Sequence, residues 1–98
     1  MQRAAWVFTL KPGKEQEYID AHAKVWPELI EAAQAAGMRN QSLYIQGSIV
    51  FAYTEADDID LAMAKLDALD VTRRWNEAMS EMMQDVDGAR LPEIFHFE

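Results

Sequence analysis

The 98-residue sequence predicts one α+β domain, residues 1–98, in which a four-stranded antiparallel sheet carries helices on one face. Three observations lead to this prediction. Segments rich in β-branched and aromatic residues occur four times, and helical periodicity fills two long intervals between them. The second and third of these segments are separated only by a short glycine turn, as in a hairpin.

The first predicted strand covers residues 3–10, RAAWVFTL, and ends at the turn formed by residues 11–13. Apolar side chains occupy both alternating sets of positions along this strand. That pattern is typical of a strand that is buried on both faces.

The first helical region is predicted in two pieces. A helix begins at Lys14, but Pro27 disfavours helical geometry at Trp26, so we expect a break there. Pro27 then suits the first position of a second piece over residues 27–36. Gly37 is expected to end that piece in the left-handed conformation.

Two further strands are predicted over residues 38–46 and 48–54, joined at Gly47. The first alternates apolar and polar side chains, which indicates a half-buried strand, whereas the second is apolar on both sides.

The second helical region is also expected in two pieces. Acidic side chains open the first, over residues 55–69, and Asp70 is the predicted N-cap of the second, over residues 71–83. A loop over residues 85–90 and a short closing strand over residues 93–97, EIFHF, follow. The resulting order of strands and helices is that of the ferredoxin-like fold.

Such a sheet has a second face that the helices leave open. Both faces of the strands at residues 4–10 and 49–53 are apolar, and no remaining segment can supply a cover. We therefore expect a homodimer in which the two sheets pack face to face.

The composition excludes several classes of partner. Seventeen acidic and nine basic residues give a formal charge of −8, which repels phosphate groups, so neither nucleic-acid nor membrane binding is expected. The sequence has no cysteine, which excludes disulfides, thiol catalysis and cysteine-type zinc sites. No apolar run is long enough to span a bilayer and nothing marks export, so we expect a cytoplasmic protein.

The candidate chemistry lies in residues 17–29, EYIDAHAKVWPEL. Tyr18, His22 and Trp26 are four residues apart, so on a helix they lie in one row. An imidazole can gain or lose a proton near neutral pH, and our hypothesis is that His22 is a general acid–base. Tyr18, His22 and, from the last helix, Trp75 would face a pocket between helices and sheet. Aromatic faces of this kind suit a sugar, although the same spacing is also typical of core packing.

A metal site is not expected. The two histidines, His22 and His96, are far apart in the sequence, and no His-x-x-x-His motif occurs. His96 alternates with Phe95 and Phe97 in the last predicted strand, and we interpret it as structural or exposed.

Four stretches resemble the L-rhamnose mutarotase family, in the same order and across essentially the whole chain. They are EYIDAHAKVWPEL, the Gly-x-x-Asn stretch at residues 37–40, DVTRRW at 70–75 and the terminal EIFHF. The string YxxxHxxxWPEL is the most specific, because it joins uncommon residue types at fixed spacing. The resemblance implies a dimeric ferredoxin-like α/β barrel that interconverts the α and β anomers of a deoxy-hexose without cofactor or metal.

The resemblance also implies roles for single residues. His22 corresponds to the proton donor, and Tyr18 and Trp75 correspond to residues that contact the sugar. Family members commonly have Tyr where this chain has Gln41, and a second Trp where it has Asn76. Both positions belong to the sugar-contacting set, and amides replace stacking with directional hydrogen bonds. We therefore expect L-rhamnose, L-fucose or a related hexose as the substrate.

The mechanistic hypothesis is ring opening and closure, in which protonated His22 is the acid and Tyr18 or a water assists at the anomeric hydroxyl. Two alternatives share the fold. One is a cofactor-free monooxygenase acting on an aromatic substrate, against which the polar Gln41 and Asn76 argue. The other is a dimer that binds a small molecule without catalysis.

Overall fold

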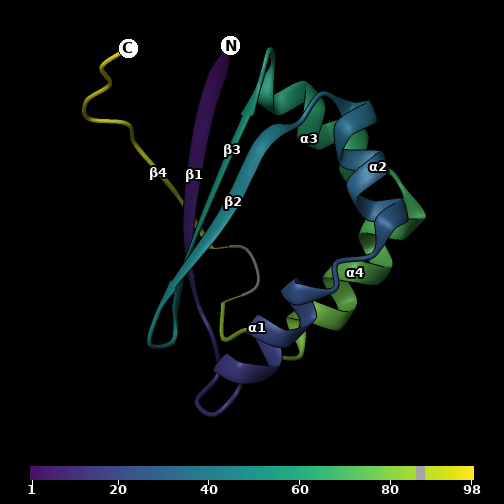
Figure 1. Cartoon of the computed structure of the whole chain (residues 1–98), viewed down its shortest axis with the longest axis vertical. Coiled ribbons are helices and arrows are strands. Elements are labelled where there is room, and N and C mark those ends of the chain that lie inside the picture. The colour runs from purple at the N-terminus through teal and green to yellow at the C-terminus, as the bar shows by residue number, and fades with distance from the viewer. Residues whose placement is uncertain (86–87) are drawn as a thin grey trace.

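The computed structural model describes residues 1–85 and 88–98, and in them a four-stranded sheet carries four helices along one face (Figure 1). The strands lie in the order β2-β3-β1-β4. This order, with antiparallel pairing throughout, confirms the predicted ferredoxin-like α+β fold. The strands are β1 (Gln2–Thr9), β2 (Arg39–Gln46), β3 (Ile49–Ala56) and β4 (Ala89–Leu91), and the helices are α1 (Glu15–Ala23), α2 (Pro27–Ala36), α3 (Ile59–Asp67) and α4 (Asp70–Ser80).

Strand β1 is central and pairs with β3 over its full length, from Gln2 opposite Ala56 to Thr9 opposite Ile49. On its other side it pairs with the short strand β4. Strand β2 pairs only with β3, so β2 is an edge strand of the protomer.

The predicted break in the first helical region is confirmed. α1 ends at Ala23, and Trp26 has an extended backbone, at φ −58° and ψ 127°, as a residue before proline requires. α2 then begins at Pro27, and Gly37, at φ 108°, ends it in the left-handed conformation.

The predicted cap of the last helix is wrong. The N-cap residue is Leu69, and Asp70 is the first residue inside α4. The Asp70 carboxylate pairs instead with Arg73 and Arg74 on the same first turns. The two guanidinium groups therefore bind the Asp70 carboxylate, which as an N-cap would accept a hydrogen bond from a backbone N–H of the first helical turn.

The predicted closing strand is also wrong. The fourth strand is Ala89–Leu91, which pairs with Ala5–Val7 of β1, and residues 92–98 form no regular element. Pro92 has no backbone N–H to continue the ladder, which explains why the strand stops there. Within the predicted loop, residues 86 and 87 lie outside the described residues, whereas Ala89 and Arg90 belong to β4.

Two buried clusters lie between the helices and the sheet. Alternating residues of β1 and β3, together with Leu10 just after β1, contribute to the clusters, because those side chains point to the helical face. Tyr18 is one of their members, so core packing accounts for part of its environment. The clusters are Ala4, Met38, Ala56, Ile59 and Ala62, and Leu10, Tyr18, Val50, Met79 and Met82.

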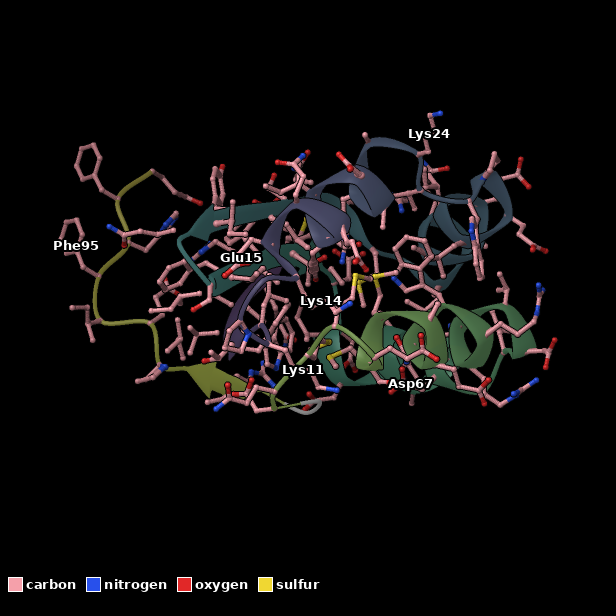
Figure 2. All side chains as sticks on the ribbon, turned by 90° about the horizontal axis from the view of Figure 1, so that it is seen from below. Lys11, Lys14, Glu15, Lys24, Asp67 and Phe95 are labelled. Atoms are coloured by element: carbon pink, nitrogen blue, oxygen red, sulfur yellow. The ribbon has the colours of Figure 1, made fainter. Side chains whose placement is uncertain are left out.

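The opposite face of the sheet carries none of the described helices (Figure 1). Phe51 and Tyr44, which are opposite each other in the β2–β3 ladder, are 37% and 65% exposed. The C-terminal segment after β4 stands away from the helices, and Phe95 lies on it (Figure 2). Ile94, Phe95 and Phe97 are 78–94% exposed. No helix among the described residues is long and apolar enough to cross a membrane.

Candidate active site

A cavity of about 680 Å³ lies between the helices and the sheet. Its walls come from six elements. β1 and β3 supply Phe8 and Ala52, and the first two helices, β2 and α4 supply most of the remainder. The lining groups that can form hydrogen bonds are Tyr18, His22, Gln34, Arg39, Asn40, Gln41 and Trp75. A smaller hollow of about 350 Å³ adjoins the cavity and shares Tyr18, His22 and Leu43 with it.

The protonation of the His22 ring follows from one hydrogen bond. Its Nδ1 lies 2.8 Å from the carbonyl oxygen of Tyr18, and a carbonyl can only accept. Nδ1 therefore carries a hydrogen, which it donates to Tyr18, and Nε2 is the nitrogen that can exchange a proton.

His22 lies between two aromatic rings. The centroid of the Tyr18 ring is 4.2 Å away and that of the Trp75 indole is 5.4 Å away, and both arrangements are edge-on. Such geometry is favourable for aromatic pairs and restricts the imidazole to one orientation. The sequence-predicted meeting of α1 and α4 around one pocket is thus observed in the structure.

Tyr18 is only 5% exposed, and burial raises the pKa of its phenol to about 12. The phenol is therefore neutral at physiological pH. A neutral phenol can donate a hydrogen bond to a ligand, but it cannot serve as a base there.

Gln41 lies at an irregularity of β2. The register with β3 shifts between Arg39 and Ser42, and Asn40 has a positive φ of 50°. Asparagine tolerates this left-handed conformation better than most residues. A bulge bends its strand and redirects side chains, and Gln41 here lines the cavity.

The bulge is anchored on β3. The Asn40 side-chain amide donates to Glu55 Oε1 at 2.7 Å, and the Tyr53 hydroxyl donates to Glu55 Oε2 at 2.5 Å. These hydrogen bonds, from Tyr53 first and Asn40 second, lower the pKa of the Glu55 carboxyl. Glu55 is therefore a charged acceptor that holds Asn40 in place.

Four of the five predicted site residues line the one cavity: Tyr18, His22, Gln41 and Trp75. Asn76 does not; it follows Trp75 on α4 and its side chain is exposed. No group of three or more metal-ligating side chains occurs in residues 1–85 and 88–98.

The sequence-based analysis did not predict three further polar lining residues, Gln34, Arg39 and Asn40. The Arg39 guanidinium donates to the backbone carbonyls of Gln34 and Met38, which ties the start of β2 to the end of α2. An asparagine inside a predicted strand is unfavourable and can indicate a bulge. Of these three residues, Asn40 is therefore the one from which the bulge could have been predicted.

Comparison with known proteins places the chain in a family. A family model described as L-rhamnose mutarotase matches residues 3–97. The L-rhamnose mutarotase of Paraburkholderia xenovorans is 34% identical over 86 residues, which is 86% of this chain and 79% of the relative. That of Bacteroides thetaiotaomicron is 30% identical, with both chains covered completely.

Solved structures agree. The crystal structure of L-rhamnose mutarotase from Formosa agariphila matches with a TM-score of 0.84 and 25% identity over the whole of both chains. A tetracenomycin F2 cyclase from Streptomyces glaucescens matches with a TM-score of 0.73 and 18% identity, covering 100% of this chain and 98% of the cyclase, which shows a shared fold only. The chain belongs to the L-rhamnose mutarotase family.

Proposed function

We propose that the cavity between helices and sheet is the active site in which this isomerase interconverts the α and β anomers of a deoxy-hexose. The observation that carries the proposal is the hydrogen bond from His22 Nδ1 to the Tyr18 carbonyl, because it reserves Nε2 for proton exchange at an aromatic-walled cavity. The names of the relatives support L-rhamnose as the first sugar to test.

The reaction needs one proton delivered and one removed. Protonated His22 donates its Nε2 hydrogen to the ring oxygen as the bond between that oxygen and the anomeric carbon breaks. The anomeric hydroxyl gives its proton to a water, and an open-chain aldehyde results. After rotation about the adjacent carbon–carbon bond, the freed hydroxyl attacks the other face of the aldehyde and returns its proton to neutral His22. The water returns its proton to the carbonyl oxygen, which becomes the new anomeric hydroxyl. The neutral Tyr18 phenol can orient the sugar by donating a hydrogen bond, and it is not the base.

The side chains around His22 suit a sugar. Tyr18 and Trp75 offer aromatic surface on which the apolar face of a hexose can stack, and Gln41 offers a donor and an acceptor for hydroxyl groups. An aromatic monooxygenase substrate would leave the Gln41 amide without partners, so the polar lining favours the sugar.

Saturation-transfer NMR tests the proposal by measuring anomer exchange for L-rhamnose, L-fucose and other hexoses in parallel. We expect enzyme-dependent acceleration for at least one deoxy-hexose. Sugar binding with no acceleration would support the non-catalytic binding alternative, and oxygen uptake with an aromatic substrate would support the monooxygenase.

The helix-free face of the sheet supports a homodimer formed by sheet-to-sheet packing. Large apolar side chains on this face and on the C-terminal segment are exposed in the protomer, at a cost that burial against a second copy would remove. They include Tyr44, Ile49, Phe51 and Leu91 on the sheet and Ile94, Phe95 and Phe97 after it.

A further inference from the structure

The segment Trp26-Pro27-Glu28 belongs to the most specific string of the sequence, yet none of its three residues is among those that line the cavity. Trp26 instead contacts a residue that does. Its indole lies edge-on to that of Trp75, with ring centroids 5.1 Å apart and an interplanar angle of 86°. Trp75 is therefore held on one side by His22 and on another by Trp26.

A second contact holds Trp26 itself. The Arg74 guanidinium lies 5.7 Å from the centre of the Trp26 ring, within the range of a cation–π interaction. Arg74 donates to Asp70 Oδ2 at 3.0 Å on its own helix and to Glu28 Oε1 at 3.2 Å on α2. An arginine stays charged at physiological pH, so the positive charge beside Trp26 is permanent, and the hydrogen bonds to Asp70 and then Glu28 raise the Arg74 pKa further.

Pro27 fixes the backbone from which Trp26 extends. A residue before proline is restricted to extended geometry, and the Trp26 carbonyl accepts from the backbone N–H groups of Leu29 and Ile30 at 3.0 and 3.2 Å. Trp26 is thus the N-cap residue of α2, and the first turn of that helix holds its backbone.

We infer that Trp26 is a positioning residue for Trp75, and that Glu28, acting through Arg74, keeps Trp26 in place. The inference rests on the proposed function, in which the Trp75 indole forms a wall for the sugar. Trp26 and the Glu28–Arg74 pair fix the orientation of the Trp75 indole. The Trp-Pro-Glu segment therefore affects sugar affinity without contacting the sugar.

A spectroscopic measurement tests the contact independently of activity. Two indoles at this separation should couple and give an exciton couplet in the circular dichroism spectrum. We expect the couplet to be lost in Trp26→Phe and equally in Trp75→Phe. It should persist in Trp6→Phe, because the Trp6 indole lies on β1, beside the Arg90 guanidinium of β4. A couplet that persists in Trp26→Phe would overturn the inference.

A functional measurement uses Trp26→Leu, with Trp26→Phe as the conservative replacement. An aromatic pair contributes roughly 0.5–1.5 kcal/mol, so we expect sugar affinity to fall about 2- to 10-fold in Trp26→Leu and to recover partly in Trp26→Phe. The rate at saturating sugar should change less than KM, because His22 is not altered. Unchanged affinity in Trp26→Leu would overturn the inference.

Glu28→Gln has a matched control in Glu31→Gln, an acidic residue also exposed on α2. We expect Glu28→Gln to weaken the couplet and sugar affinity, and Glu31→Gln to change neither. Affinity is also measured by equilibrium titration of tryptophan fluorescence. If the wild type binds sugar without accelerating anomer exchange, the proposed function fails, while the couplet and the titration still decide the inference.

Discussion

The Nδ1 atom of His22 lies 2.8 Å from the carbonyl oxygen of Tyr18, one turn earlier in α1. The backbone of α1 therefore does for this imidazole what a separate carboxylate does in many enzymes: it fixes the tautomer and the orientation of the ring. One short helix thus holds the proposed acid–base and the side chain expected to contact the sugar beside it.

Replacement of His22 by Ala should lower anomer exchange about 10²- to 10⁴-fold, since that is the usual contribution of a positioned acid–base group. Exchange is measured by saturation transfer with the best sugar of the panel. His96→Ala is the control, because His96 lies on the C-terminal segment near Glu93 and outside the cavity. Wild-type exchange in His22→Ala would refute the proposed role.

The raised pKa of the buried Tyr18 phenol predicts that folding stability depends on pH. Its folded pKa of about 12 exceeds the ordinary value of 10.0. Between these values the unfolded chain ionises this tyrosine while the folded protein keeps it protonated, so stability falls as pH rises from about 10 to about 12. The loss should reach roughly 2–3 kcal/mol.

Urea unfolding of the wild type and Tyr18→Phe at about pH 9 and about pH 12 measures this difference. Tyr18→Phe should lose less stability than the wild type over the interval. The same pH dependence in wild type and Tyr18→Phe would contradict the burial argument.

Short-range rules predicted much of this molecule. Pro27 and Gly37 act through their own backbone geometry, so the break and end of the first helical region could be located from the sequence. The four-residue spacing of Tyr18 and His22 likewise determines that both lie on one side of α1. These features depend on neighbours along the chain and therefore leave a pattern in it.

Two of the failures concern contacts between distant segments, and one concerns side chains of a single helix. β4 forms at Ala89–Leu91 because the backbone of β1 can pair with another strand there. These three residues, Ala-Arg-Leu, are too few and too varied in type to predict a strand. Asp70 was expected to cap a helix, but two arginines compete for its carboxylate. The bulge that brings Gln41 to the cavity depends on Glu55 of the neighbouring strand.

Gln41→Tyr and Asn76→Trp test two positions for which the sequence-based analysis predicted the same role, contact with the sugar. Gln41 lines the cavity, so Gln41→Tyr should change the ratio of exchange rates between L-rhamnose and L-fucose by about 10-fold or more, as expected when one site hydrogen bond is exchanged for apolar surface. Asn76 is exposed and outside the lining, so Asn76→Trp should change the ratio less than Gln41→Tyr. A larger change in Asn76→Trp would contradict the geometry of the cavity.

Two substitutions of Asn40 test whether its positive φ in the β2 bulge costs folding stability. Asn40→Ala and Asn40→Gly both remove the hydrogen bond to Glu55, but only glycine adopts the positive φ of 50° freely. Asn40→Gly should therefore be about 1 kcal/mol more stable than Asn40→Ala in urea unfolding. Equal stability of the two variants would show that the left-handed backbone costs nothing at this position.

The helix-free face of the sheet predicts the oligomeric state. Phe51 is 37% exposed at the centre of that face, so a buried aspartate in Phe51→Asp would lose hydration without a partner if two sheets pack together. We expect light scattering at micromolar concentration to show a dimer for the wild type and a shift to monomer for Phe51→Asp.

Leu61→Asp is the control for that measurement. Leu61 is another large apolar residue, 52% exposed, but it lies on α3 on the helical side of the molecule. The variant should therefore stay dimeric. Replacing Phe95 and Phe97 together by serine should weaken the dimer as well, if the C-terminal segment packs on the second copy. A monomeric wild type, or a dimer disrupted by Leu61→Asp and not by Phe51→Asp, would place the interface elsewhere.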